Sequence, residues 1–192
     1  MAIRKPPGPP DGMAAISRAL PNLMWRGPGA RRTLPLLPRI QASQPIQLFM
    51  LKSNDISSAN FLEKAVPVGW RYLIVNDGPV AVADVNAEGA KQAASFASLI
   101  RGPLAERLVQ AAELAERKYG ADSNVFDVRI LEIPSLYVSA LWLHGDRDVF
   151  IPFLEGGERD RGEVQEDPSF QARVRAMALA KTRAAPNPEP SR

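Results

Sequence analysis

The side chains best suited to chemistry in this sequence lie close together near residue 144. His144, the only histidine among 192 residues, is followed at alternate positions by Asp146 and Asp148. In an extended strand such residues share one face, and imidazole and carboxylate groups together can hold a divalent cation. This arrangement would suit a small metal-assisted hydrolase. The competing interpretation is structural, because the stretch from Gly145 to Asp148 also has the composition of a hairpin turn.

Asp84 is a second candidate, because it lies inside an otherwise apolar predicted strand. A buried carboxylate can have a raised pKa and act as an acid or a base. More often it lies beside a base, and Arg71 across the predicted hairpin is the nearest choice. Glu132 and Asp77 are weaker candidates. The sequence contains neither a Gly-x-Ser-x-Gly elbow nor a phosphate-binding glycine loop, so we assign no catalytic residue and expect no cofactor.

Charge and proline are concentrated in residues 1–45. This segment holds seven basic residues against one acid, together with nine of the 18 prolines, whereas the remaining 147 residues hold 17 basic and 20 acidic ones. Large apolar residues accompany the basic ones, which a purely flexible linker would not need. We therefore predict an extended, Pro-rich N-terminal arm that lies along a surface. Its candidate partner-binding residues are Trp25, Arg26, Arg31, Arg32, Leu34 and Leu36.

Three kinds of partner suit such an arm. Arginine beside tryptophan can bind nucleic acid through phosphate contacts and stacking, and the same residues can bind an acidic protein groove or an anionic membrane. The basic residues are only moderately dense and never run longer than two, which favours a protein partner in a homo- or hetero-oligomer. The predicted function is a non-catalytic interaction or scaffold subunit of a larger assembly. The metal-assisted hydrolase and a nucleic-acid-binding accessory protein remain the alternatives.

Composition also bears on the compartment. No apolar run approaches the roughly 18 residues that span a bilayer, so no transmembrane segment is predicted. The sequence contains no cysteine, which removes disulfides and thiolate metal sites and is compatible with a reducing cytoplasm. We therefore expect a cytoplasmic protein.

The elements that must position these residues follow from hydrophobic periodicity and turn signals. Four parts are predicted: an arm (1–45), an α+β domain (46–154), an acidic loop with a C-terminal helix (155–183), and a flexible tail (184–192). Strands are expected at 46–52, 68–76, 80–86, 125–133, 136–144 and 149–154. Helices are expected at 58–65, 88–101 and 103–119, with another opened by Asp167-Pro168 and a short one at 13–20 that Pro21 ends.

This β-α-ββ-α-βββ-α order predicts an α+β fold with a mainly antiparallel sheet and helices packed on one face. The strands, however, are apolar on both sides: at 136–144 one side carries Leu136, Val138, Ala140 and Trp142, and the other Tyr137, Ser139, Leu141 and Leu143. A sheet of this kind needs a second cover. The arm, the C-terminal helix, a second copy of the chain or another protein could supply it.

From Ser58 to Lys181 the predicted order α-ββ-α-βββ-α is similar to that of roadblock or longin-type domains. The resemblance is one of element order and includes no shared motif. It would imply a dimerising scaffold whose sheets pair edge to edge.

Overall fold

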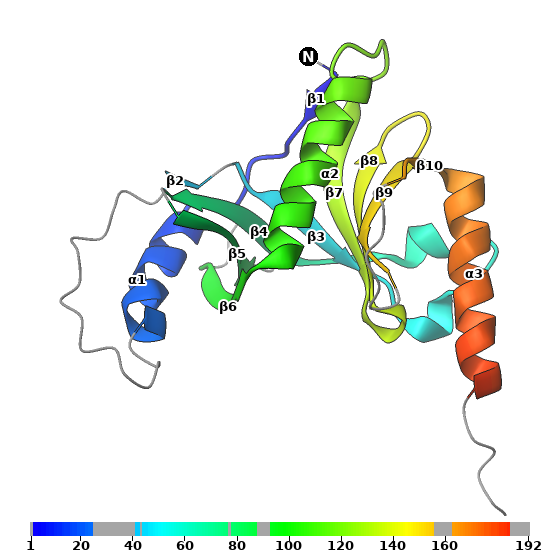
Figure 1. Cartoon of the computed structure of the whole chain (residues 1–192), viewed down its shortest axis with the longest axis horizontal. Coiled ribbons are helices and arrows are strands. Elements are labelled where there is room, and N and C mark those ends of the chain that lie inside the picture. The colour runs from blue at the N-terminus through cyan, green and yellow to red at the C-terminus, as the bar shows by residue number, and fades with distance from the viewer. Residues whose placement is uncertain are drawn as a thin grey trace, which may run out of the picture.

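The computed structural model describes residues 2–24, 41–42, 44–76, 78–87, 93–155 and 163–184. They form three α-helices, three short 3-10 turns and one sheet of ten strands (Figure 1). The helices are α1 (Gly12–Met24), α2 (Pro103–Tyr119) and α3 (Asp167–Ala184). The strands are β1 (Ile3–Arg4), β2 (Gln41–Ala42), β3 (Ile46–Met50), β4 (Val66–Asn76), β5 (Gly78–Asn86), β6 (Ser95–Arg101), β7 (Phe126–Ile133), β8 (Val138–His144), β9 (Val149–Leu154) and β10 (Gln165–Glu166). The predicted α+β class is confirmed.

The strands cross the sheet in the order β10-β9-β8-β7-β3-β4-β5-β6, while β1 pairs with β7 and β2 with β4. Two antiparallel meanders, β7 to β10 and β4 to β6, make up most of it. The strand β3 joins them, because it runs antiparallel to β4 and parallel to β7. The predicted hairpin between residues 68 and 86 is confirmed as β4 and β5, with Arg71 opposite Asp84.

One face of the sheet is covered by α2, which crosses its centre (Figure 1). The helix begins as the sequence predicts, because Gly102 adopts a φ of 94° that favours glycine and Pro103 occupies the first turn. Gly120 caps its other end, donating its N–H to the carbonyl of Glu116. The buried side of the helix consists of Ala105, Leu108, Ala111 and Ala115, which pack against the sheet.

The opposite face is covered by α1 and α3, which lie at the two ends of the long axis (Figure 1). From α1, Ile16 and Leu20 pack beside Tyr72, and from α3, Phe170 and Val174 pack among the side chains of β8 and β9. The chain's own ends therefore supply the second cover that a two-faced sheet requires. The predicted placement of the helices on one face holds for α2 alone.

The first 24 residues, predicted as the beginning of the arm, contact the sheet in two places. β1 pairs in parallel with β7, and α1 begins beside Tyr72, whose side chain leaves no room for a Cβ at Gly12. Asp11 also accepts a 3.0 Å hydrogen bond from the backbone N–H of Ala94, just before β6. These contacts fix α1 over the β4–β6 meander.

The predicted helix at 88–101 is wrong where it can be tested, because Ser95–Arg101 forms β6 and residues 88–92 lie outside the described residues. Its apolar residues fit a helical stripe and a strand equally well. In the sheet they are divided between the two faces: Phe96 and Leu99 pack toward α1, and Ile100 packs on the α2 side. Pairing with β5 therefore decides that this segment is a strand, although the spacing of its apolar residues also fits a helix.

Two other helix predictions have wrong boundaries. α1 continues past Pro21 to Met24, since a proline in the last turn removes a single N–H donor. The helix predicted at 58–65 shrinks to a 3-10 turn, Phe61–Lys64, which buries Phe61 and Leu62. Further 3-10 turns occupy Ser53–Asp55 and Pro134–Leu136.

Candidate functional site

The cluster predicted around His144 is assembled only in part. Across the turn between β8 and β9, the Nδ1 of His144 lies 2.8 Å from the Oδ1 of Asp148. Asp146 forms no hydrogen bond or ion pair with a described residue. In the part of the chain that the structure describes, no three His, Asp or Glu side chains are placed to hold a metal ion. Gly145 to Asp148 form the turn that connects β8 to β9, as the alternative interpretation of this stretch predicts.

A groove of about 320 Å³ lies beside this turn. It is lined by the turn and the start of α3, namely Gly145, Asp146, Arg147, Asp148, Glu166, Asp167 and Pro168. The cation of this lining is already engaged, with a nitrogen of Arg147 3.0 Å from the carboxylate of Asp122. A backbone N–H of Asn124 and the Arg147 guanidinium hold the pKa of Asp122 below its usual value, although burial opposes them. The acidic lining would repel an anionic substrate.

The candidate Asp84 takes part in a buried ion triad. Its two carboxylate oxygens accept hydrogen bonds from Nε and Nη2 of Arg71, at 2.7 and 2.8 Å. Arg71 is 2% exposed, and its Nη2 also lies 2.8 Å from Glu132 Oε1. Ser98 donates a further hydrogen bond to Asp84. The predicted neighbour of Asp84, Arg71, is therefore confirmed. The sequence did not indicate that Glu132 also binds Arg71, because β7 lies two strands away from β4 in the sheet.

The electrostatics of this triad favour a structural role. Burial alone would lower the pKa of the Arg71 guanidinium, but the hydrogen bonds and charges of Asp84 and Glu132 outweigh it and raise that pKa. An arginine that is charged at every accessible pH holds both carboxylates in place and cannot exchange protons with a substrate. The triad joins β4, β5 and β7, and we assign it no catalytic step.

The outer edge of β6 is a candidate binding surface that the sequence does not indicate, because this segment is predicted to be helical. It forms the last strand of the sheet, and no described strand pairs with its outer edge. Proteins usually protect such edges with short strands, prolines, lysines or bulges. β6 has seven residues, no proline and no lysine. Its single irregularity is at Ala97, which has no partner in the register between β5 and β6.

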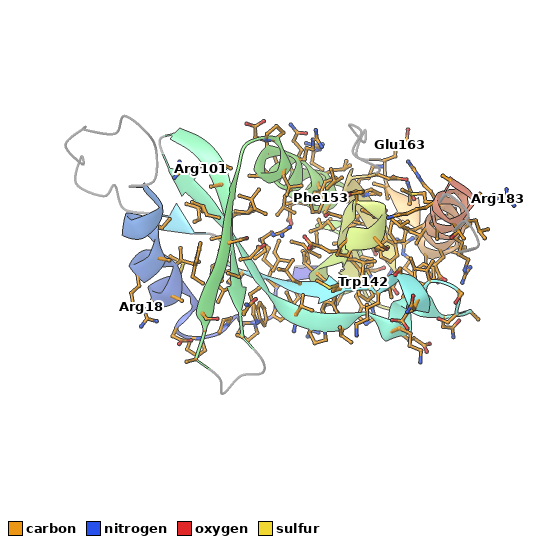
Figure 2. The ribbon with its side chains drawn as sticks, turned by 90° about the horizontal axis from the view of Figure 1, so that it is seen from below. Arg18, Arg101, Trp142, Phe153, Glu163 and Arg183 are labelled. Carbon is orange, nitrogen blue, oxygen red and sulfur yellow. The ribbon has the colours of Figure 1, made fainter. Side chains whose placement is uncertain are left out.

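Two exposed arginines lie on the elements that form this edge. Within α1 and β6 the only charged residues are Arg18 and Arg101, and both are exposed. Figure 2, which views the molecule from below, shows β6 crossing the front with Arg101 at its end and Arg18 on the neighbouring helix α1. The basic segment that begins at Trp25 follows α1 directly in the chain. A seven-residue edge that no described strand pairs with therefore lies beside two exposed arginines.

The six partner-binding residues predicted in the arm cannot be placed. Trp25, Arg26, Arg31, Arg32, Leu34 and Leu36 all lie outside the described residues. Only their attachment point is fixed, since α1 ends at Met24 and packs against β5 and β6.

Comparison of the chain with family models, with curated proteins and with solved structures finds no match. None of the described helices is both long and apolar enough to cross a membrane.

Proposed function

We propose that this chain is a non-catalytic interaction subunit that binds an extended, acidic segment of a partner protein along the outer edge of β6. The observation that carries the proposal is the seven-residue edge strand, which no described strand covers. The unpaired N–H and C=O groups of such an edge can form a ladder with an incoming strand. Main-chain hydrogen bonds then supply affinity, and the flanking side chains supply specificity.

Charge argues for an acidic partner. Arg18 and Arg101 flank the edge, and residues 25–40 add four arginines and no acid. Opposite charges across an interface speed encounter and suppress wrong partners. A second copy of the chain would bring the same basic groups to both sides of a shared edge, so like charges disfavour the edge-to-edge dimer that the element order implied. A protein segment with acidic residues fits better.

In this proposal the arm has a supporting role. Its arginines and its apolar anchors, Trp25, Leu34 and Leu36, follow α1 in the chain, and α1 packs against β5 and β6. We expect an arm attached there to extend the contact beyond the strand. Linking a second contact to the first raises overall affinity through its high effective concentration. The absence of cysteine suits the reducing cytoplasm, where we expect the complex to form.

Site-specific photo-crosslinking in the native cell tests this proposal. A photoreactive residue at Ala97, an exposed position on β6, should crosslink to a partner protein, and sequencing of the joined peptide should return an acidic segment. A matched probe at Val125, which is 55% exposed and precedes β7, should not capture that segment. Changing Arg18 and Arg101 to glutamate should lower the yield at Ala97.

Three results would overturn the proposal. Crosslinks from Ala97 that join two copies of this chain would identify a homo-oligomer instead. Crosslinks to nucleic acid would support the alternative use of the basic arm. No crosslink at Ala97, with a folded protein verified by circular dichroism, would show that the edge is unused.

A further inference from the structure

A second feature lies on the face of the sheet opposite α2, where Arg129 of β7 is held between two aromatic rings. Its guanidinium carbon lies 4.9 Å from the ring centroid of Phe49 and 4.9 Å from that of Trp142. Trp142 is directly opposite Arg129 in the β7–β8 register. Cation–π contacts of this kind hold a guanidinium in one orientation. They use its flat face and leave the N–H groups in its plane free to donate hydrogen bonds.

Those donors remain available. The Arg129 side chain forms no hydrogen bond or ion pair with any residue in the described ranges. None of its side-chain nitrogens is both buried and without a partner, so solvent reaches them. Arg71 differs, since its guanidinium is buried and bound to two carboxylates. Arg71 therefore binds acids of its own chain, whereas Arg129 is held in position with no described acid bound to its guanidinium.

The two carboxylates whose charges act on Arg129 each have another partner. Asp127 accepts a 2.6 Å hydrogen bond from Nε of Arg4, and Asp148 pairs with His144. Burial lowers the pKa of Arg129, and the charges of Asp127 and Asp148 act in the opposite direction, which shows that both lie within electrostatic reach. Arg4 offsets much of the negative charge of Asp127, and Asp148 shares a hydrogen bond with His144, so neither carboxylate is bound to the Arg129 guanidinium.

We infer that Arg129 is the anchor of a binding site for a carboxylate ligand, separate from the β6 edge. A guanidinium presents parallel N–H groups that match the two oxygens of a carboxylate. The site lies on β7, and β3, β4 and β5 separate that strand from β6. The inference is independent of the proposed strand addition, and either can fail without the other.

Charge favours a carboxylate over a phosphate at this site. A monoanion neutralises the single unpaired charge of Arg129. A phosphate dianion would leave excess negative charge beside Asp127 and Asp148, where repulsion is strongest in the partly buried surroundings. The source of the carboxylate is either a small organic acid or an acidic side chain of a peptide.

Nuclear magnetic resonance of the full-length protein tests this inference through two signals. The Nε–H of Arg129 is assigned from its loss in Arg129→Lys, and the indole Nε1–H of Trp142 from its loss in Trp142→Phe. The probes are sodium acetate, inorganic phosphate, and the capped tripeptides Gly-Glu-Gly and Gly-Gln-Gly. We expect acetate and the Glu peptide to move both signals saturably, with a dissociation constant on the order of 10 mM. Tighter binding of the Glu peptide than of acetate would identify a protein side chain as the source, and the reverse a free acid.

Two variants with the same change of charge provide the control. Arg129→Gln should abolish the movement of the Trp142 signal, whereas Arg117→Gln, at an exposed position on α2, should leave it unchanged. The retained Trp142 signal also reports whether Arg129→Gln is folded. Equal shifts with the Glu and Gln peptides, tighter binding of phosphate than of acetate, or an unchanged response in Arg129→Gln would each overturn the assignment.

Discussion

The two edges of the sheet are built differently. At one edge β10 has two residues, and the chain then turns directly into α3, where Phe170 stacks on Phe150 of β9 with ring centroids 4.1 Å apart. At the other edge β6 has seven residues, and its described helical neighbours, α1 and α2, pack on opposite faces of the meander. The first, or closed, edge is a two-residue strand that leads into a packed helix, and the second, or open, edge is a seven-residue strand whose outer side no described strand pairs with. Under the proposed function the second edge is the binding end of the sheet.

The largest expected effect comes from the triad that connects the meander of β6 to β7. Arg71→Ala leaves the partly buried carboxylates of Asp84 and Glu132 without their buried base, and should lower the free energy of unfolding by about 3–5 kcal/mol. Urea denaturation followed by circular dichroism measures this loss. Arg4→Ala, which breaks an exposed ion pair, should change stability little by comparison. Equal losses in the two variants would contradict the assigned role of the triad.

The closed edge should depend on its aromatic stack. Phe170→Ala removes a fully buried ring that contacts Phe150, and should cost about 3–4 kcal/mol of stability in the same denaturation assay. Leu179→Ala, on the exposed side of the same helix, should stay within about 0.5 kcal/mol of the wild type. If Phe170→Ala were equally mild, α3 would not be what closes this edge.

The open edge should respond in binding and not in stability. Ala97→Glu places an acid on the exposed edge of β6, where it would repel an acidic segment and reduce crosslinking from a probe at Ser95 about tenfold. Ala97→Gln has nearly the same shape without the charge and should keep most of the yield. Both variants should unfold at wild-type urea concentrations, since the side chain is exposed. Equal yields from the two variants would remove the electrostatic part of the proposal.

The smallest effect is one of pH at the junction of β1 and β7. The hydrogen bond from Arg4 holds the pKa of Asp127 below its usual value, against the effect of burial. A lowered folded-state pKa stabilises the protein above the unfolded-state pKa, about 3.9, and the contribution is lost as the pH falls through the folded-state value. The stability difference between wild type and Asp127→Asn should therefore be constant above about pH 5 and shrink below pH 4. A difference that does not depend on pH would exclude this linkage.

Sequence reasoning succeeded where the signals were local. The hairpin of β4 and β5, the Gly102–Pro103 start of α2 and the Asp167–Pro168 start of α3 all follow from turn and cap chemistry. The requirement for a second cover also followed from the sequence, because alternation alone shows that both faces are apolar.

Long-range arrangement was beyond the same signals. β6 was predicted as a helix because an apolar spacing of three and four residues fits both structures, and only its pairing with β5 decides between them. Glu132 reaches Arg71 across β3, a contact that depends on strand order. The aromatic sandwich around Arg129 likewise combines residues from β3, β7 and β8, so no short motif could have indicated it.

The position of β7 constrains how the protein is made. β1 and β3 both pair in parallel with β7: Ile3 pairs with Phe126, and Gln47 pairs with Arg129. Neither strand can form these pairs until β7 has been synthesised. On the ribosome, at about 5–20 residues per second, the N-terminal half would be exposed for several seconds before β7 emerges. Parallel contacts of such long sequence separation also fold slowly. Before β7 emerges, the nascent chain therefore exposes the β7-facing edge of β3 to the cell, and this is the stage at which chaperone binding or misassembly would occur.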